Sequence, residues 1–484
     1  MKRSLLTDAV WLTISKGIVT LFTIISTMLL SRFRTLTDYG TYSELLIIIN
    51  LVSTALFLGL PNSINFFLPR CEDKTEKRSF LGTYFSTSCV MGSIAGILVF
   101  STIPLWIKYF GNPEIQKYWF FLLVIPLTKI LTTGADNLFI NFHRTNFLVV
   151  YRIAHSFIQL VLIFVIQFLS KSFQSYLALY VMIEGAFSLL VVFLTYREVG
   201  TFSFCIKWDL LKRVLTFSIP LGLASAVGIL NVEMDKLIIG YFLTTDELAI
   251  YSNASRELPI AVLASSFTTV LIPRISKMIK DEKYKDAAVL WNRVTLFSYS
   301  VIIFFCVFLC SYSKEVLVIL YSEKYIGGYI VFAIYSISLI FQSTYFGMFL
   351  NVTGNTKYIF KASLISMLAN AILNIVFYYV FGFWGPALST LGCVTLLAYY
   401  QLRLTSKIID IRIQDIFTLK EYMYPAVILL VLAVTAFCLK RLLQGKILSF
   451  GETVVCGAIW LMIYGAFMLK RTRNLLILMR EDTE

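Results

Sequence analysis

The chain has 484 residues, of which 58% are hydrophobic and only 14% are charged, and its mean hydropathy is +0.79. Soluble domains carry about 25% charged residues, so this composition excludes a soluble globular protein. The formal net charge is +14, but without a soluble basic surface this charge gives no reason to expect a nucleic-acid partner. Two histidines and eight scattered cysteines argue against a metal centre, and the cysteines are expected to be buried, reduced thiols.

Apolar runs of about 20 residues, long enough to cross a ~30 Å hydrocarbon core as a helix, recur from end to end. The first follows a basic start, as in a signal sequence, but it contains Lys16 and lacks a small-residue cleavage site. We therefore expect a retained first helix and no soluble domain. The predicted spans lie near residues 8–31, 42–68, 79–104, 117–141, 147–169, 174–196, 214–242, 248–273, 294–313, 328–352, 358–380, 385–406, 424–440 and 447–469.

The distribution of Lys and Arg predicts the orientation of these spans. With the N-terminus inside, the inner segments hold 28 of the 42 Lys and Arg residues and the outer loops hold 10. Positive residues accumulate on the cytoplasmic side of membrane proteins, so both termini are predicted to be cytoplasmic. Contact with anionic lipid headgroups is a second use for the positive charge.

Three landmarks recur in the same order at an offset of about 204 to 210 residues, which indicates an internal duplication. Six spans separate the copies. Because six is even, both copies cross the membrane in the same sense, as parallel repeats do. The landmarks are FRTLTDYGTYS (33–43) and FLTTDELAIYS (242–252), FLPR (67–70) and LIPR (271–274), and Asn141 and Asn351.

We therefore predict an all-α polytopic membrane protein of about 14 transmembrane helices. Residues 1–206 would form an N-terminal six-helix bundle and residues 207–412 a C-terminal one. Residues 413–484 would form transmembrane helices 13 and 14 and a cytoplasmic tail. Two parallel six-helix repeats around a central cavity can rock between inward-open and outward-open forms, which is the physical basis of alternating access.

Ionisable residues within the spans are the candidate functional residues, because each costs about 2.5–3.5 kcal/mol at the bilayer centre. A cavity lined by Lys and Arg suits an anionic ligand, whose phosphate-type oxygens accept charge-assisted hydrogen bonds. Intramembrane carboxylates are candidates for H⁺ or Na⁺ coupling, or for gating. No catalytic residue, metal site or cofactor is predicted. The cations are Lys16, Arg32, Lys129, Lys236 and Arg256, and the carboxylates are Asp136, Glu184, Glu233, Asp235 and Glu257.

Several of these charges also have a structural interpretation, as ion pairs that hold helices together. Glu233 and Lys236 are spaced i,i+3 and can pair along one helix face. Lys129 and Asp136 are seven residues apart and are expected on one face of span 4. Lys16 has no local partner, which favours a cavity-facing position, whereas Arg32 can equally extend to the membrane interface.

The string MDKLIIGYFLTTDELAIYS (234–252) resembles the hallmark segment of polysaccharide exporters, in which an Asp-Lys pair precedes an apolar run and a polar turn. The segment TDYGTYS (37–43) resembles the first-repeat version of the same motif. With the span count and the two halves, the chain resembles the O-antigen/polysaccharide flippases (Wzx type). These belong to the multidrug/oligosaccharidyl-lipid/polysaccharide (MOP) exporter superfamily, and the resemblance covers essentially the whole chain.

The resemblance implies a transporter, not an enzyme, in the bacterial inner membrane. It would move an undecaprenyl-diphosphate-linked oligosaccharide from the cytoplasmic to the periplasmic leaflet, driven by an H⁺ or Na⁺ gradient or the membrane potential. Membrane lipids, a polysaccharide polymerase and chain-length proteins would be its partners. A lipid II flippase and a drug/ion antiporter are the alternatives, although more cavity carboxylates are expected in the antiporter. A membrane polymerase or ligase would need a sizeable outer loop, and a non-transporting scaffold is the remaining alternative.

Overall fold

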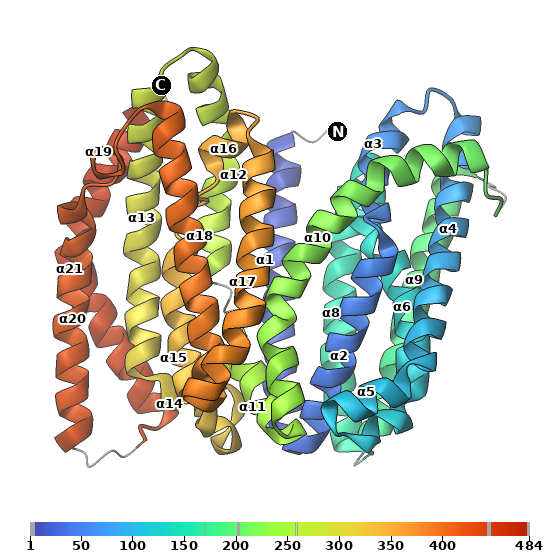
Figure 1. Ribbon diagram of the computed structural model, residues 1–484, viewed down its shortest axis with the longest axis horizontal. Coiled ribbons are helices and arrows are strands. Elements are labelled where there is room, and N and C mark those ends of the chain that lie inside the picture. The colour runs from blue at the N-terminus through green and yellow to red at the C-terminus, as the bar shows by residue number, and fades with distance from the viewer. Residues whose placement is uncertain are drawn as a thin grey trace. The chain divides into compact units, whose positions relative to one another are not determined.

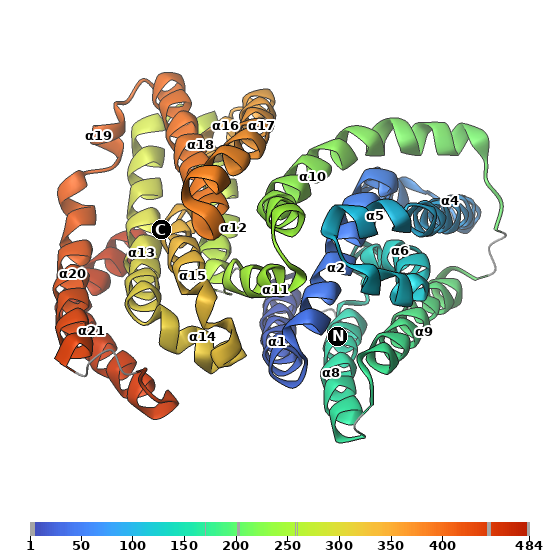
Figure 2. The ribbon, with the colours of Figure 1, turned by 60° about the horizontal axis from the view of Figure 1, so that its bottom comes forward.

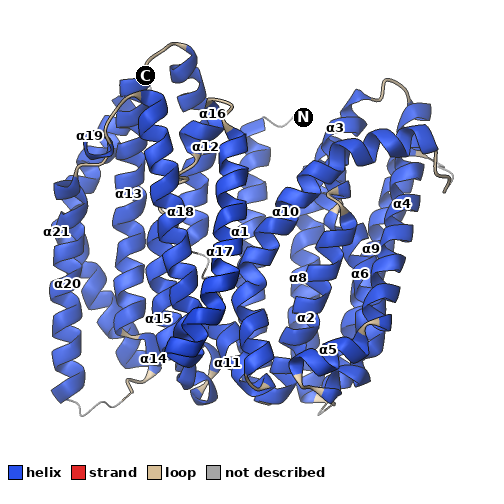
Figure 3. Cartoon of the chain, in the orientation of Figure 1, coloured by secondary structure: helices blue, strands red, loops and turns tan. Residues whose placement is uncertain are grey.

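The computed structural model of the protein describes residues 5–169, 171–200, 204–256, 258, 260–442 and 447–481. Every regular element among these residues is a helix, as Figure 3 shows. The prediction of an all-α protein is therefore confirmed. The helices pack into two compact units, Met1–Ala249 (unit 1) and Ile250–Glu484 (unit 2).

Unit 1 is a bundle of helices joined by short turns. Two of its helices begin at clear caps. The Thr35 side chain accepts a hydrogen bond from the N–H of Asp38 (3.0 Å), and Asp73 accepts one from the N–H of Glu76 (2.6 Å). Each cap satisfies an N–H group that has no partner within the helix. The helices are α1 (Leu5–Phe33), α2 (Leu36–Phe57), α3 (Ser63–Phe67), α4 (Lys74–Ser101), α5 (Ile103–Phe110), α6 (Trp119–Thr133), α7 (Ala135–Asn141), α8 (Thr145–Phe168), α9 (Phe173–Val199), α10 (Trp208–Phe242) and the first turns of α11 (Thr245–Ala254), with the 3₁₀ helices η1 (Leu60–Asn62), η2 (Leu68–Arg70) and η3 (Pro113–Tyr118).

The core of unit 1 fixes the helices that carry the charged residues. Phe85 of α4, Ile130 of α6, Leu138 of α7 and Leu148 of α8 are fully buried and belong to one hydrophobic cluster. Their interdigitation holds α6 and α7 in a defined register against α4 and α8. Polar side chains on these helices therefore have fixed positions relative to one another.

The long helix α10 lies beside α2, as Figures 1 and 2 show. It has 35 residues and contains Pro220. The two backbones come very close at Gly222, where a Cβ atom would lie 2.3 Å from the carbonyl carbon of Leu58. Only glycine permits this approach. It anchors α10 to unit 1 and brings the charged segment NVEMDK (231–236) alongside α2.

Unit 2 contains the remaining helices. Trp291 of α13 is fully buried and donates a hydrogen bond from Nε1 to Oγ1 of Thr344 (2.7 Å). Tyr464 of α21 donates its hydroxyl hydrogen to the carbonyl oxygen of Ser300 (2.7 Å), which joins α21 to α13. The helices are the end of α11, α12 (Ala261–Lys280), α13 (Tyr284–Ser311), α14 (Ser313–Tyr321), α15 (Tyr329–Ser338), α16 (Met348–Val352), α17 (Thr356–Phe381), α18 (Gly385–Ile409), α19 (Ile413–Ile416), α20 (Leu419–Leu442) and α21 (Phe450–Glu481), with the 3₁₀ helices η4 (Glu323–Gly328), η5 (Leu339–Gln342) and η6 (Gly382–Trp384).

The membrane-spanning character of the chain is evident in these helices. Among the described residues, 12 segments are long and apolar enough to cross a membrane, and one of them, Thr356–Ile409, contains both α17 and α18. The predicted span at 248–273 is divided between α11 and α12, and α12 ends in a basic stretch. This division accounts for one of the two segments by which the number falls short of fourteen, and the counting of α17 and α18 as one segment accounts for the other.

The predicted ends of span 2 differ from the observed ones. The segment TDYGTYS, most of which precedes the predicted span at 42–68, lies within α2, which begins at Leu36 because Thr35 caps it. The helix ends at Phe57 because Leu58 and Gly59 adopt positive φ angles of 47° and 68° ahead of Pro61. The second copy, TDELAIYS, lies likewise within α11.

The packing boundary at residues 249 and 250 differs from the predicted repeat boundary at 206 and 207. Helix α10 packs on α2, α3, α4 and α5 and therefore belongs to unit 1. The repeat boundaries concern the duplication of the sequence and stay a prediction, as does the central cavity.

Candidate functional site

Two of the predicted cations meet in unit 1, in a hydrogen-bonded cluster formed by α2, α6 and α10. The Lys129 Nζ atom donates to Oδ1 of Asn50 (2.6 Å), and Nδ2 of Asn50 donates to Oε1 of Glu233 (3.0 Å). Oε2 of Glu233 accepts from Nζ of Lys236 (3.0 Å). Asn50, Lys129, Glu233 and Lys236 are called the α2–α6–α10 cluster below.

The charges in this cluster do not cancel. One carboxylate, Glu233, lies between two ammonium groups, and Lys129 interacts with it electrostatically in addition to its bond to Asn50. The side chains of Lys236 and Glu233 are 19% and 10% exposed, so they are enclosed but can still be reached. Asp235 is buried, and its Oδ1 atom accepts a hydrogen bond from the N–H of Lys236 (2.8 Å). Two lysines held on facing helices can bind an anion with several oxygens.

Lys129 and Asp136, which were predicted on one face of a single helix, lie on two separate helices and have different partners. The helix is interrupted at Gly134, between α6 and α7. Asp136 instead forms a bidentate pair with Arg152 of α8, with Oδ1 to Nε at 2.8 Å and Oδ2 to Nη2 at 2.5 Å. Asp136 therefore joins α7 to α8 through an ion pair. Lys129 instead interacts with residues of α2 and α10.

We expect Arg152→Ala to destabilise the protein by about 1–2 kcal/mol, because a bidentate charge-assisted pair is lost and Asp136 keeps an uncompensated charge. Thermal unfolding of purified protein measures this change. In a double-mutant cycle, Arg152→Ala should have little further effect once Asp136 is alanine. Full additivity of the two substitutions would contradict the role of the pair.

Glu184 of α9 also has local partners. Its Oε1 atom lies 2.9 Å from Nε2 of His155 and accepts a hydrogen bond from Nε2 of Gln159 (2.5 Å), both on α8. Glu184 itself is 7% exposed. These contacts join α8 to α9, as expected of a carboxylate with a structural role.

The remaining predicted residues lie apart from the cluster. Lys16 lies on the exposed side of α1, and Arg32 is exposed in the last turn of that helix. Arg256, in unit 2, borders a recess of about 10 Å³ with Tyr335 and Leu339, which has room for about one water molecule. Glu257 lies outside the described residues.

Four polar residues that the structure makes important did not emerge from the sequence. Asn50 is uncharged, so a search for intramembrane charges does not find it. Arg152 lies within α8 and within the predicted span at 147–169, but it was not among the candidate intramembrane charges. Glu44 was placed at the edge of span 2 because that span was predicted to begin at residue 42. Asn112 lies in an interhelical segment and was not considered, although the pattern Asn-Pro-Glu indicates a helix cap.

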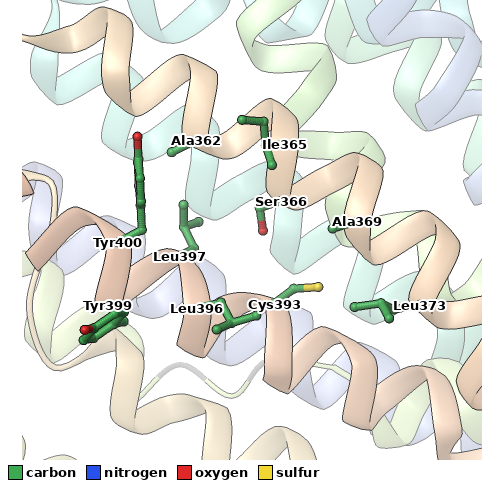
Figure 4. A pocket seen from close by; sticks show the side chains of 10 residues that line it. All are labelled: Ala362, Ile365, Ser366, Ala369, Leu373, Cys393, Leu396, Leu397, Tyr399 and Tyr400. Atoms are coloured by element: carbon green, nitrogen blue, oxygen red, sulfur yellow. The ribbon is translucent and has the colours of Figure 1, made fainter. Parts of the chain in front are cut away.

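A pocket of about 360 Å³ in unit 2 has a different character. Figure 4 shows Ala362, Ser366 and Ala369 of α17 facing Leu397 and Tyr400 of α18 across it. Its walls are almost entirely carbon, with no charged residue among those that line it. This pocket suits hydrocarbon and offers nothing to an anion, so the anion-binding candidate is the α2–α6–α10 cluster.

Comparisons with known proteins agree with this fold and composition. A family model described as "Polysaccharide biosynthesis protein" matches residues 29–330. The capsular polysaccharide biosynthesis protein CapF of Staphylococcus aureus is 22% identical over 387 residues, which are 77% of this chain and 92% of CapF.

Two solved structures share the fold. The lipid II flippase MurJ, in an inward closed conformation, matches with a TM-score of 0.73 and 20% identity over 96% of this chain and 99% of MurJ. An inward-facing multidrug resistance MATE transporter of the MOP superfamily matches with a TM-score of 0.64 and 13% identity over 83% and 98% of the two chains. At these identities the likeness establishes the fold.

Proposed function

This chain belongs to the polysaccharide biosynthesis protein family, with the fold of the MOP exporter superfamily, and from that premise we propose that it is a flippase for a lipid-linked oligosaccharide. The substrate class is an undecaprenyl-diphosphate-linked glycan such as an O-antigen repeat unit. It would pass from the cytoplasmic to the periplasmic leaflet of a bacterial inner membrane by alternating access. An H⁺ or Na⁺ gradient, or the membrane potential, would drive the movement, and the protein would act without catalysing a reaction.

The α2–α6–α10 cluster is the observation that carries this proposal. A diphosphate presents several anionic oxygens, and Lys129 and Lys236 supply two ammonium donors on different helices. Glu233 offsets one of the two positive charges while the site is empty, which lowers the cost of keeping the lysines in the membrane. When the diphosphate binds, it takes over the contacts that Asn50 and Glu233 provide. A cationic drug would find no comparable carboxylate excess at this cluster.

Reconstitution in liposomes tests the proposal directly. Purified protein is incorporated with a fluorescent undecaprenyl-diphosphate-oligosaccharide, and the fraction accessible to an external quencher is followed with time. We expect exchange between leaflets that depends on the protein, and none in empty liposomes. Equal exchange in both preparations would refute the proposal. Faster exchange of lipid II than of the oligosaccharide lipid would instead favour the lipid II flippase.

The orientation can be checked with Cys205, in the segment before α10, which is predicted to be cytoplasmic. The expectation that all cysteines are buried is wrong for this residue, whose thiol is exposed. An impermeant maleimide added to intact cells should not label Cys205, whereas permeabilised cells should be labelled. Burial, and then the charge of Glu76, raises the pKa of the Cys71 thiol, so this second cytoplasmic cysteine should react more slowly. Labelling of Cys205 in intact cells would show that the predicted orientation of the chain in the membrane is inverted.

A further inference from the structure

A second polar centre in unit 1 lies near the start of α2, at its predicted outer end. Glu44 is fully buried, and both of its carboxylate oxygens accept hydrogen bonds. Nδ2 of Asn112 donates to Oε2 (2.6 Å), and the hydroxyl of Thr245, in α11, donates to Oε1 (2.8 Å). Among the described residues no cation is paired with Glu44.

This centre joins the two copies of the repeated motif. Thr245 belongs to the second copy and Glu44 follows the first directly. The Thr37 hydroxyl donates to Oδ1 of Asp246 (2.8 Å), a contact between residues 209 positions apart, which is the offset of the duplication. Gly40 makes the contact possible, because a Cβ atom there would lie 2.1 Å from the carbonyl oxygen of Thr245. The contact surface formed by Thr37, Gly40, Glu44, Thr245 and Asp246 is called the motif interface.

Three hydrogen bonds fix the orientation of the Asn112 amide, and this orientation argues against a metal ion at Glu44. The Oδ1 atom of Asn112 caps η3 by accepting from the N–H of Glu114 (3.0 Å). Its Nδ2 atom therefore points to Glu44 and also donates to Oγ1 of Thr41 (2.9 Å). Thr41 in turn donates to the carbonyl oxygen of Thr37 (2.8 Å). Amide hydrogens occupy the place where a cation would have to coordinate the carboxylate.

A proton, in contrast, can bind to this centre with only one rearrangement. Asn112 Nδ2 can only donate, so it stays bonded to Oε2 in either state. A proton on Oε1 makes that oxygen a donor, and the Thr245 hydroxyl can rotate to accept from it. An ionised carboxylate without a cation is costly to bury, and binding one H⁺ from water removes this charge.

From this geometry we infer that Glu44 is a proton-binding residue whose ionisation state controls the motif interface. The ionised form holds Thr245 by a charge-assisted hydrogen bond, which is about twice as strong as a neutral one. Protonation replaces it with a neutral bond and weakens the contact between α2 and α11. The assignment of this proton to transport coupling rests on the proposed function, whereas proton binding itself does not.

Most charged groups on the surrounding elements have other hydrogen-bond or ion-pair partners, and Glu44 is the fully buried carboxylate of this centre. Glu114 pairs with Lys117, Asp246 with Thr37, Glu247 with Thr244, Arg34 with the carbonyl oxygen of Lys171, and Lys129 and Lys236 with the α2–α6–α10 cluster. The side chain of Asp38 is half-buried, and Arg32 is exposed at the end of α1.

Infrared difference spectroscopy of the full-length protein in lipid nanodiscs tests the inference without any transport. Spectra are recorded from about pH 9 down to about pH 5, a range in which buried carboxyl groups can titrate. We expect a carboxylic C=O band to appear on acidification in the unaltered protein, to be lost in Glu44→Gln and to persist, shifted, in Glu44→Asp. Glu114→Gln, at an exposed ion pair, is the matched control and should leave the band unchanged.

A second measurement detects the consequence at the motif interface. The double variant Thr37→Cys/Asp246→Cys is treated with a short bifunctional thiol reagent across the same pH range. Cross-linking should fall on acidification, and it should lose its pH dependence when Glu44 is glutamine. A band that Glu44→Gln does not remove, or cross-linking with the same pH profile in both proteins, overturns the inference. Either failure leaves the liposome assay of the proposed function unaffected.

Discussion

Replacing Lys129 by alanine is expected to reduce export of the lipid-linked oligosaccharide strongly while the amount of protein in the membrane stays normal. The substitution removes one of the two ammonium groups of the α2–α6–α10 cluster. Asn50 and Lys236 keep their bonds to Glu233, so the contact between α2 and α10 survives. Loss of a charge-assisted contact to the diphosphate costs about 1.5–3 kcal/mol, which corresponds to a tenfold to hundredfold loss of transport.

The liposome assay measures this loss, and two further variants identify its cause. Lys129→Arg keeps the positive charge and should retain part of the activity. Lys117→Ala removes a lysine from an exposed ion pair with Glu114 and should transport normally. Normal transport by Lys129→Ala would mean that this lysine only joins α6 to α2 and does not bind the substrate. The sequence predicts the same loss for Lys16→Ala, because Lys16 has no local partner in its span; Lys16 is exposed on α1 and lies apart from the cluster, so the assay tests it independently.

Much of the fold follows from the sequence, because long apolar runs and the asymmetry of Lys and Arg are strong, local signals. The pairing of charges does not follow, because it depends on which helices meet. Lys129 and Asp136 are close in sequence, yet the break at Gly134 directs them to different neighbours, Asn50 and Arg152. The Glu233–Lys236 pair was predicted because both residues lie on one unbroken helix, and the structure contains it at 3.0 Å.

The duplication was visible in the sequence, but its physical meaning was not. In the sequence, the repeated segments served only as landmarks of the duplication and of the family resemblance. In unit 1 the first copy and the start of the second contact each other through Thr37 and Asp246 and through Glu44 and Thr245. Glu44 was missed because its position relative to the membrane depends on where α2 begins. The cap at Thr35 places that start six residues before the predicted start of span 2 at residue 42.

Substitution of Gly40 by alanine is expected to separate the two motifs. The added Cβ atom would lie 2.1 Å from the carbonyl oxygen of Thr245 and 2.6 Å from its Cγ2 atom, and neither can move without displacing the start of α11. Overpacking of this kind costs about 1–3 kcal/mol. Loss of the Thr245 donor leaves one oxygen of buried Glu44 unsatisfied, which adds about 1–3 kcal/mol. We expect a clearly lower unfolding temperature and loss of cross-linking between cysteines at positions 37 and 246.

Gly17→Ala is the matched control, because no atom lies within 4 Å of the Cβ that alanine would add in α1. Alanine is favoured over glycine within a helix by about 0.5–1 kcal/mol, so this variant should be as stable as the unaltered protein or slightly more stable. An unfolding temperature and cross-linking yield unchanged by Gly40→Ala would mean that the two motifs do not need close contact. Because Gly40 cannot titrate, its alanine variant should lower cross-linking at every pH, whereas Glu44→Gln should remove only the pH dependence. The two substitutions therefore separate the packing of the motif interface from its control by a proton.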